Sequence, residues 1–467
     1  MKISILTMFP ELFDNFLASP VVNRARGKGN LEVNLVDIKA YAKGSFRNID
    51  DSPCGGGPGM LIRVDVLHNA LKEVQNNQTK AHVVLLSPKG ATYNQQKAKS
   101  FALLENLVLI CGHYEGCDAR IEKYVDEQIS IGDFILTGGE LAAMTIVDSV
   151  ARLLKGSLRT GATEQESFEQ NLLEYPQYTH PVEYNGDRVP EVLLSGDQGA
   201  IRQWKMAQSI METIKFRPKL FNQAIVSKTF GDTKLEEIEI GKSSARIFSF
   251  NDMVLKIDVL SEVSKREYQA LKWLEGRLPA PKLLGYESND KKSYILMTKV
   301  KGKMLCDPSI LSNRRRLLKS AVAALRTLWC VDLTNCPFSQ GLDLDLKEAK
   351  SKHRFKPNSR GQVLLTWLEE NRPVTKAEDL VLSHGDLCLP NILVSCHGIE
   401  GLLDFGRIGV ADKWRDIVVC LRSLKNNLEG CGPAVYGPFD EKEFYEILGI
   451  EPDLEKIKYY TLLDQLL

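Results

Sequence analysis

The sequence lacks several features that would place a protein in a specialised class. It has no excess of either charge, since 60 Lys and Arg balance 60 Asp and Glu. Any contact with nucleic acid must therefore come from local basic patches. No apolar run is long enough to span a bilayer, and the N-terminal MKISILTMFPELF lacks the long apolar stretch of a signal peptide. We expect a cytoplasmic protein without a membrane partner.

Cysteine pairs and a dinucleotide motif are missing as well. The ten cysteines are scattered without a CxxC pair, which excludes the usual spacing of a zinc or redox site. No GxGxxG follows the first predicted strand, so a Rossmann dinucleotide site is not supported. What is present is a chain of 467 residues, long enough for two or three folded domains.

The chain divides into two halves that differ in their hydrophobic pattern. Up to residue 221, strand-like runs such as KISILT and HVVLLS alternate with helical segments such as ELAAMTIVDSVARLL. This alternation predicts an α/β domain with a mostly parallel sheet. IRQWKMAQSIMETIKF then predicts a long helix that ends at the proline of RPKLF. Beyond it, LEEIEIG and IFSFNDMVLKID predict antiparallel strands, and the chain after KGKMLCD is largely helical.

The second half contains the residues that phosphoryl transfer needs, in the order that kinases use. The reaction requires a lysine on the phosphates, an acid that holds it, an aspartate for the acceptor hydroxyl, and Asn and Asp ligands for magnesium. Lys256 lies in VLKID, and Glu267 follows in SKREYQALKWL. Asp386 and Asn391 lie in HGDLCLPN, and Asp404 begins DFG. Each residue alone is typical of an ordinary surface or turn, but the full set with this spacing predicts a phosphotransferase site.

The motifs of this half also resemble a known family. LSHGDLCLPNILV, LLDFGRIGVADKWRDI and YYTLLDQLL are similar to the aminoglycoside 3′-phosphotransferases, over residues 235–467. The resemblance implies a two-lobed, protein-kinase-like α+β domain, with an N-lobe at 235–301 and a C-lobe at 302–467. It also implies ATP, Mg²⁺ and transfer of phosphate to a small-molecule hydroxyl, as in antibiotic resistance. The implied roles are catalytic base for Asp386, metal ligands for Asn391 and Asp404, nucleotide contacts for Ser243, Lys256 and Glu267, and acceptor contacts for Arg407 and Leu467.

The acceptor side departs from that family. Aminoglycosides are polycations, and the family meets them with an acid-rich loop before the catalytic segment. Residues 346–361, LKEAKSKHRFKPNSRG, instead contain six Lys or Arg and one Glu, and Gln465 replaces a terminal Glu. We expect this basic stretch to repel a polycation. The acceptor therefore stays open, with RNA or another anionic partner as an alternative, and so does the choice between ATP and GTP.

Three glycine-bearing stretches stand out in the first half. They are CGGGPGM at 54–60, CGHYEGCDARI at 111–121 and SIGDFILTGGELAAM at 130–144. Glycines beyond strand ends let backbone amides and carbonyls approach a flat ligand such as adenine closely. Each stretch alone is typical of a tight turn, but the three together predict a ligand pocket.

With FPELF, LLSPKG, DSVARLL and YPQYTHP, these stretches resemble the bacterial tRNA (guanine-N1)-methyltransferases, the TrmD family of the SPOUT superfamily. The resemblance covers about residues 1–221 and implies a homodimer that transfers a methyl group from S-adenosylmethionine to the guanine 3′ of the tRNA anticodon. It implies a trefoil-knot α/β domain at 1–165, one of the rare knotted folds, and a helical tRNA-binding subdomain at 166–221. We place a linker at 222–234. The matching donor-pocket positions are Leu86, Ser87, Pro88, Gly112, Tyr114, Gly116, Ile131, Gly132, Leu136, Gly138 and Gly139.

The same resemblance implies the catalytic residues of this half. Arg152 matches the active-site arginine, and Glu115 is counted with it. Because guanine N1 loses a proton as it is methylated, a carboxylate base near neutral pH is expected. The family places an Asp on a mobile loop, whereas LRTGATEQESF is one residue shorter and has Glu166 there. Further departures on the RNA-binding surface are His180, Asp197–Gln198 and Met206.

Two functions follow for the whole chain. The preferred interpretation is a bifunctional enzyme, with a tRNA methyltransferase fused to an aminoglycoside-type phosphotransferase. In the alternative, the first half is a donor- or RNA-binding dimer module that does not methylate, and only the phosphotransferase is active. The intact donor pocket favours the first interpretation, and the change from Asp to Glu166 favours the second. Whether the two sites are coupled stays open.

Overall fold

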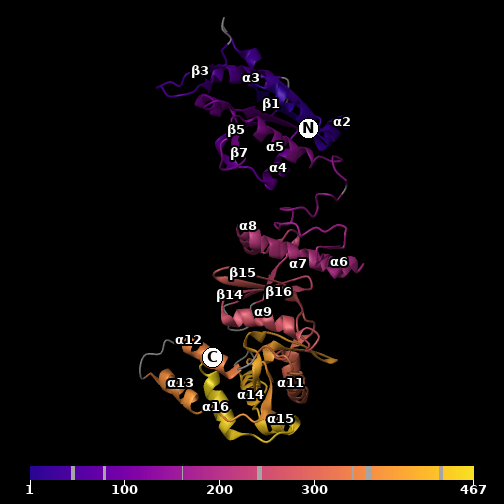
Figure 1. The fold of residues 1–467 in the computed structure, drawn as a ribbon, viewed down its shortest axis with the longest axis vertical. Coiled ribbons are helices and arrows are strands. Elements are labelled where there is room, and N and C mark those ends of the chain that lie inside the picture. The colour runs from indigo at the N-terminus through magenta and orange to yellow at the C-terminus, as the bar shows by residue number, and fades with distance from the viewer. Residues whose placement is uncertain are drawn as a thin grey trace. The chain divides into compact units, whose positions relative to one another are not determined.

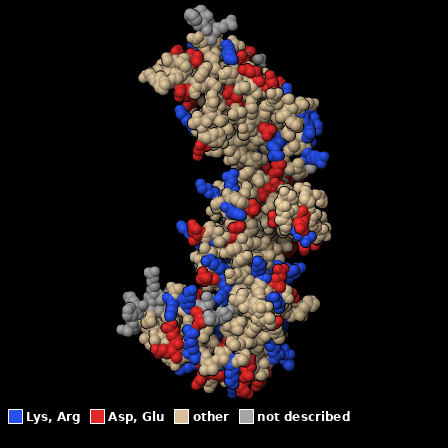
Figure 2. Space-filling model, in the orientation of Figure 1, with Lys and Arg blue, Asp and Glu red and all other residues tan. Residues whose placement is uncertain are grey.

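The computed structural model describes residues 1–43, 48–76, 80–159, 161–238, 245–338, 341–352, 359–430 and 435–467. These residues form two compact units, Met1–Glu169 and Gln170–Leu467 (Figure 1). Within the ranges given, no helix combines the length and the apolar character needed to cross a bilayer. Lys and Arg are interspersed with Asp and Glu over the visible face of each unit, as their equal numbers lead one to expect (Figure 2).

The first unit is built on a parallel sheet of five strands in the order β2-β1-β6-β5-β7. This confirms the parallel α/β sheet predicted from the sequence. The strands are β1 Lys2–Thr7, β2 Glu32–Asp37, β5 His82–Thr92, β6 Asn106–Cys111 and β7 Glu127–Ser130. The longer helices are α2 Pro20–Gly27, α3 Val64–Asn76, α4 Gln95–Ala102 and α5 Glu140–Ala151.

Alternate residues of the central strands bury against opposite layers of helices. Ile5 and Leu109 share a core with α2, α4 and α5, whereas Leu6 and Ile110 share one with α3. Since successive strand residues point to opposite faces, both faces of this sheet are buried, which explains the nearly continuous apolar runs. The shorter elements are η1 Pro10–Phe13, α1 Asp14–Leu17, η2 Ile38–Tyr41, β3 Asp50–Asp51, β4 Leu61–Ile62 and η3 Ala119–Tyr124.

The second unit begins with a helical segment. Its helices are α6 Glu191–Leu194, α7 Gln198–Phe216 and α8 Pro218–Ser227, with the hairpin β8 Glu183–Tyr184 and β9 Asp187–Arg188 before them. The Asp197 side chain accepts hydrogen bonds from the Gly199 and Ala200 amides and so caps the start of α7. The helix ends before Pro218, where the sequence predicts its end.

An antiparallel sheet follows in the order β12-β13-β14-β16-β15. Its strands are β12 Glu236–Glu237, β13 Arg246–Phe250, β14 Met253–Val259, β15 Leu283–Ser288 and β16 Lys292–Thr298, and α9 Glu262–Leu274 connects β14 to β15. The strand pairing predicted for LEEIEIG and IFSFNDMVLKID is confirmed. Ser261 caps α9 through a hydrogen bond from the Ser264 amide.

This sheet is also buried on both faces, although its strands are antiparallel. Tyr294 and Leu296 share a core with α7 and α8, whereas Ile295 and Met297 belong to the core that contains α9 and the C-terminal helices. Figure 1 shows α7 and α8 beside one face of the sheet and α9 beside the other. The helical segment of the first sequence half is therefore the outer layer of a sheet from the second.

Residues 222–234, which we expected to be a linker, are ordered secondary structure. They contain the end of α8 and the hairpin of β10 Thr229–Phe230 and β11 Thr233–Lys234. Ile225 and Phe230 are buried in the same core as Leu296. The boundary between the compact units lies instead between Glu169 and Gln170.

The rest of the second unit is mostly helical, as predicted, and surrounds two short sheets, β17-β19-β20 and β18-β21. The helices are α10 Pro308–Leu311, α11 Arg314–Trp329, α12 Gly341–Lys352, α13 Arg360–Glu370, α14 Trp414–Glu429, α15 Glu441–Leu448 and α16 Leu454–Asp464. The strands are β17 Lys303–Met304, β18 Leu380–Ser383, β19 Ile392–Ser395, β20 Gly398–Leu402 and β21 Gly409–Asp412. Single turns are η4 Ala377–Asp379, η5 Leu389–Asn391 and η6 Phe405–Arg407.

The contact between α7 and β15 predicts a sensitive glycine. A Cβ atom at Gly285 would lie 2.6 Å from Met211 Cγ. We expect Gly285→Val to lower the free energy of unfolding by about 1–3 kcal/mol, because overpacking pushes α7 from the sheet. Urea unfolding followed by circular dichroism measures this. Gly27→Ala is the control, since its Cβ meets nothing within 4 Å, and equal stability of the two variants would contradict the packing.

Candidate functional sites

In the first unit, the parallel strands bring the predicted donor-pocket residues to one edge of the sheet. Leu86 pairs with both Cys111 and Ile129, so the segments that follow these residues leave at the same carboxyl edge. The chain bulges out between Leu86 and Ala91 before β5 pairs with β7 again, and this bulge contains Ser87 and Pro88. The carboxyl edge of a parallel sheet is where such folds bind ligands.

Glycines allow two of these segments to touch. The Gly139 amide donates to Gly112 O at 2.8 Å, and His113 forms a β-bridge with Gly138. A Cβ at Gly139 would lie 2.7 Å from Cys111 Cα, which is closer than side chains tolerate. Gly132 has φ +153°, and the Ser130 hydroxyl bonds both its amide and its carbonyl. The absence of side chains at these glycines lets the segments pack together at the sheet edge, as a donor read by peptide groups would require.

The CGGGPGM loop packs against the loop that contains Tyr114 and Glu115. Glu115 N donates to Met60 O, and Ile62 N donates to Gly116 O. A Cβ at Gly59 would collide with the Glu115 side chain. Glu115 therefore lies against the first glycine loop, while Ile131 and Leu136 are half-buried in the third.

Arg152 and Glu166 form a bidentate ion pair. Arg152 Nη1 and Nη2 each donate to one Glu166 oxygen at 2.6 Å. This hydrogen bonding raises the pKa of Arg152 above its usual value and outweighs its partial burial, which would lower the pKa. Three residues on, Glu169 pairs with Lys99 at 2.5 Å and fixes the same loop to α4. The structure thus brings together the two predicted catalytic residues, and both oxygens of Glu166 are occupied by Arg152.

In the second unit, Lys256 joins the two acids predicted to surround the nucleotide phosphates. Its Nζ lies 2.7 Å from Glu267 Oε2 and 3.0 Å from Asp404 Oδ1. The side chains of Lys256 and Glu267 are only 9% and 4% exposed. Burial would lower the pKa of Lys256, but the two carboxylates outweigh it and the pKa is raised. Burial raises the pKa of Glu267 against the opposing charge of Lys256.

Hydrogen bonds of main-chain groups hold the loop 384–391, which contains the HGDLCLPN motif. The His384 and Gly385 amides donate to the two oxygens of Asp416 at 2.9 and 2.8 Å. Asn391 Nδ2 donates to Asp386 O at 2.9 Å, and the Asn391 carbonyl accepts from the Leu403 amide at 2.9 Å. These bonds place Asp386 and Asn391 beside the DFG segment.

The donor atoms of Asn391 and Asp404 suit a magnesium ion, because both side chains offer an oxygen. Asn391 uses its amide NH₂ toward Asp386 O, so the amide oxygen is the atom for a cation. Asp404 is 42% exposed, and Lys256 outweighs burial to lower its pKa. Over the described ranges, no cluster of three or more His, Cys, Asp or Glu residues could hold a metal. Magnesium needs few protein ligands when phosphates complete its shell, so this sparse set suits a nucleotide-bound ion.

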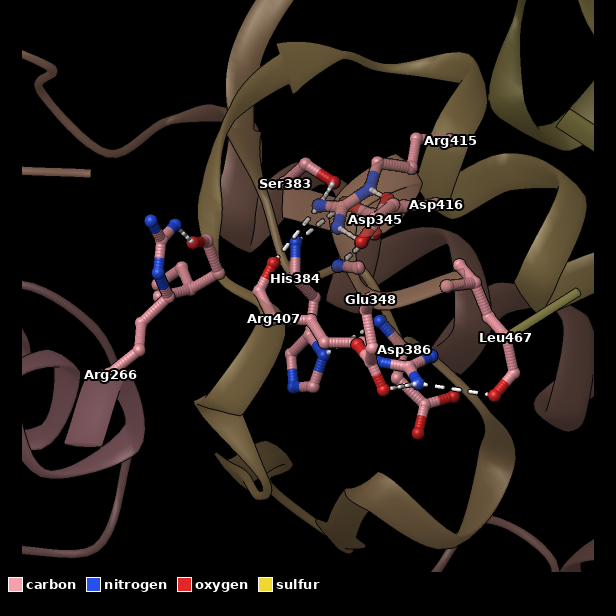
Figure 3. A network of polar contacts seen from close by, with 12 residues as sticks. Arg266, Asp345, Glu348, Ser383, His384, Asp386, Arg407, Arg415, Asp416 and Leu467 are labelled. Atoms are coloured by element: carbon pink, nitrogen blue, oxygen red, sulfur yellow. Dashed lines mark hydrogen bonds and ion pairs between the residues drawn. The ribbon is translucent and has the colours of Figure 1, made fainter. Parts of the chain in front are cut away.

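The acceptor side carries more acid than the sequence indicated. Arg407 Nη2 lies 2.8 Å from Glu348 Oε1 and 3.3 Å from Leu467 O (Figure 3). Asp464 pairs with Arg422 at 3.0 Å, and burial, reinforced by the charge of Asp386, raises the pKa of Asp464. Glu348, the one acid of the basic stretch, therefore points into the site. The predicted contact Ser243 and the stretch 353–358 lie outside the described residues.

Some contacts were missed by reasoning from the sequence. Asp416, which fixes the catalytic loop, lies in the quoted motif GRIGVADKWRDI and was given no role. Arg415 forms a bidentate pair with Asp345, and both side chains are almost fully buried. The sequence signal that could have predicted these contacts is the dipeptide Arg415–Asp416, which lies in the first turn of the helix after DFG.

The Lys256–Glu267 pair yields a stability prediction. We expect Glu267→Leu to lower the free energy of unfolding by about 3–5 kcal/mol, because it leaves a buried lysine without its main partner. Adding Lys256→Met should restore part of this loss, and chemical denaturation measures both variants. Lys265→Gln, at an exposed ion pair of the same helix, should stay within about 0.5 kcal/mol. A double variant less stable than Glu267→Leu would contradict the prediction.

Comparison with known proteins assigns the two halves to families. The profile described as tRNA (Guanine-1)-methyltransferase TrmD matches residues 1–223, and that of the Phosphotransferase enzyme family matches residues 235–436. A tRNA (guanine-N(1)-)-methyltransferase of Moorella thermoacetica is 48% identical over 233 residues, which are 49% of this chain and 92% of the relative. One from Clostridium perfringens is 44% identical over 244 residues, which are 52% of this chain and 100% of the relative.

These matches agree with the parallel α/β sheet of the first unit and with the Lys256, Asp386 and Asp404 arrangement of the second. The chain spans the relatives nearly completely and continues beyond them into the second matched region. The chain therefore belongs to the tRNA (guanine-1)-methyltransferase TrmD family and carries, after that region, a domain of the phosphotransferase enzyme family.

Proposed function

We propose that the protein is a bifunctional cytoplasmic enzyme. One half methylates N1 of the guanine 3′ of the tRNA anticodon with S-adenosylmethionine, and the other transfers phosphate from ATP to a small amino sugar. The observation that carries the first activity is the Arg152–Glu166 pair in a chain with a glycine-lined sheet edge. The observation that carries the second is Lys256 between Glu267 and Asp404.

In the methyltransferase half, main-chain groups around Gly112, Gly132 and Gly139 hold the donor. S-adenosylmethionine supplies the electrophilic methyl group. Glu166 accepts the proton that guanine N1 loses, and Arg152 orients that carboxylate before the base enters. For this step Glu166 must turn one oxygen from Arg152 to the guanine. Because Glu166 sits on a loop fixed at Glu169, its reach depends on that anchor.

A trefoil knot and a homodimer are part of this proposal. Phe134, Ile135 and Leu141 are large apolar side chains that are exposed within the third glycine stretch. Exposed apolar side chains gathered on one segment are typical of a surface that a partner covers. A second copy of the chain is the partner that the family resemblance implies.

The alternative function has its own supporting observation. Both Glu166 oxygens are engaged by Arg152, and a base held in this way accepts no proton until the pair opens. If the pair stays closed, the first half binds the donor or RNA without methylating it. Donor binding without turnover distinguishes this alternative from the bifunctional enzyme.

The methyltransferase is tested with the full-length chain, S-adenosylmethionine and tRNA. Mass spectrometry should detect N1-methylguanosine, and Arg152→Ala should lower its rate at least about 100-fold because Glu166 loses its orientation. Glu32→Gln, which breaks a pair with Lys2 at the start of strands β1 and β2, is the control and should keep the rate. Calorimetric binding of the donor with no methylated tRNA from the unaltered chain would establish the alternative.

In the phosphotransferase half, each residue has one task. Lys256 holds the nucleotide phosphates and is itself held by Glu267. Asn391 and Asp404 would hold magnesium, which neutralises charge on the transferred phosphate. Asp386 orients the acceptor hydroxyl and takes its proton. The hydrogen bonds that the His384 and Gly385 amides donate to Asp416 keep Asp386 in place.

A cationic amino sugar fits the described acceptor side. Asp464 lies near Asp386, as does Glu348 (Figure 3). Arg407 balances the charge of Glu348, and Arg422 balances that of Asp464, so the negative charge of Asp386 has no cation of its own among these residues. Net negative charge in a partly buried site attracts a cation. This supports an aminoglycoside acceptor, and with it a role in antibiotic resistance, over the anionic acceptor suggested by the basic composition of 346–361.

This activity is tested with ATP, Mg²⁺ and kanamycin. Asp386→Asn should lower phosphorylation at least about 100-fold, since the general base is lost. Asp464→Asn should raise the KM for kanamycin about tenfold and leave the KM for ATP unchanged, because one attractive charge is removed. Glu378→Gln, in an exposed pair with Lys376, is the control. An unaltered chain that phosphorylates a neutral sugar as well as kanamycin would refute the cationic acceptor.

A further inference from the structure

Two arginines hold the backbone that presents Arg407 to the acceptor side. Arg415 Nη1 donates to the carbonyl of Arg407 at 3.1 Å, and Arg266 Nη1 donates to the carbonyl of Ile408 at 2.7 Å. The side chain of Arg407 then reaches Glu348 at 2.8 Å. Figure 3 shows Arg266 approaching this segment from one side and Arg415 from the other.

The anchor provided by Arg415 belongs to the interior of the C-terminal part. Arg415 is 3% exposed, forms a bidentate pair with Asp345 and donates to Ser383 Oγ at 3.1 Å. Asp345 and Glu348 lie on the same helix, α12, one turn apart. This anchor therefore fixes Arg407 relative to the helix that contains its partner Glu348, whatever happens in the N-lobe.

The anchor provided by Arg266 is different, because it comes from the helix that holds Lys256. Arg266 directly precedes Glu267 in α9, and Glu267 pairs with Lys256 at 2.7 Å. A shift of α9 that breaks the Lys256 pair therefore moves the guanidinium away from Ile408 too. Along α9, Gly406 also packs so closely that a Cβ there would lie 2.6 Å from Val263 Cγ1.

Arg266 makes this contact without a carboxylate partner in any ion pair of the described residues. Its guanidinium lies 5.7 Å from the centre of the Phe338 ring. Burial, and then the positive charge of Arg415, lower the pKa of Arg266. A half-buried cation next to another cation is unfavourable for folding alone. Asp345 and Glu262 offset part of this effect, so the feature that distinguishes Arg266 is its hydrogen bond to the Ile408 carbonyl.

We propose that Arg266 is a positioning residue that couples the phosphate-holding lysine to the acceptor side. When α9 presents Glu267 to Lys256, the neighbouring Arg266 fixes the Ile408 carbonyl and thereby the direction of Arg407 toward Glu348. This inference rests on the proposed phosphotransferase function. The residue touches neither nucleotide nor acceptor, and it acts through the backbone of residues 407–408.

The test compares Arg266→Met with Arg277→Met in the full-length chain. Met retains the apolar stem and removes the donors and the charge. Arg277 is a matched control, because it also donates to a carbonyl, that of Trp273, and lies 5.0 Å over an aromatic ring, but on the exposed surface. We expect Arg266→Met to lower kcat/KM for kanamycin about tenfold while the KM for ATP and acceptor-independent ATP hydrolysis change less than about twofold. Arg266→Lys should restore part of the loss.

Hydrogen exchange provides a readout that needs no acceptor. The Ile408 amide bonds to Phe405 O and the Val410 amide bonds to Phe338 O. Exchange at these two amides should rise about tenfold in Arg266→Met and stay unchanged in Arg277→Met. Unchanged exchange, or equal losses in ATP and kanamycin parameters, would overturn the inference. If the unaltered chain phosphorylates nothing while exchange rises as expected, the proposed function has failed and the structural coupling stands.

Discussion

The second unit depends on covering the outer face of its antiparallel sheet. Tyr294 and Leu296 of β16 and Phe248 of β13 point to the face opposite α9 and are almost fully buried. Apolar side chains of this size, each with about 1.5–3 kcal/mol of burial energy, do not leave a sheet face in water. The cover is α7 and α8, which precede the phosphotransferase match in the chain. Family boundaries and folding boundaries therefore differ in this protein.

The opposite face of the same sheet carries Lys256, which pairs with Glu267 and Asp404. Because strand residues alternate in direction, Leu255 and Ile257 pack under α7 and α8 while Lys256 points to α9. The packing of the outer face thus fixes the position of strand β14, and with it the position from which Lys256 reaches Glu267 and Asp404. In the first unit a parallel sheet has the same role, since its strand register gathers the glycine loops at one edge.

Much of both sites could be predicted from the sequence, where spacing along the chain determines spatial neighbours. The parallel strands and the order Lys256, Glu267, Asp386, Asn391 and Asp404 are of this kind. The packing of α7 and α8 on the antiparallel sheet could not be predicted. Helical periodicity indicates that one face of α7 is buried, but it does not indicate which element packs against that face. Charge composition at 346–361 also does not predict which side chain of the stretch contacts Arg407, since the count of six cations and one acid carries no direction. Glu348 makes this contact, because α12 is fixed by the buried Asp345–Arg415 pair.

The shared core of α7, α8 and the sheet has a consequence for energetics. A ligand that binds only the folded form stabilises everything that unfolds with its site. Because α7 and α8 share one core with the sheet among the described residues, a ligand that binds near Lys256 would protect these helices from unfolding as well. The thermodynamic stability of a segment within the tRNA (guanine-1)-methyltransferase match is thus linked to ligand binding in the neighbouring phosphotransferase-family region.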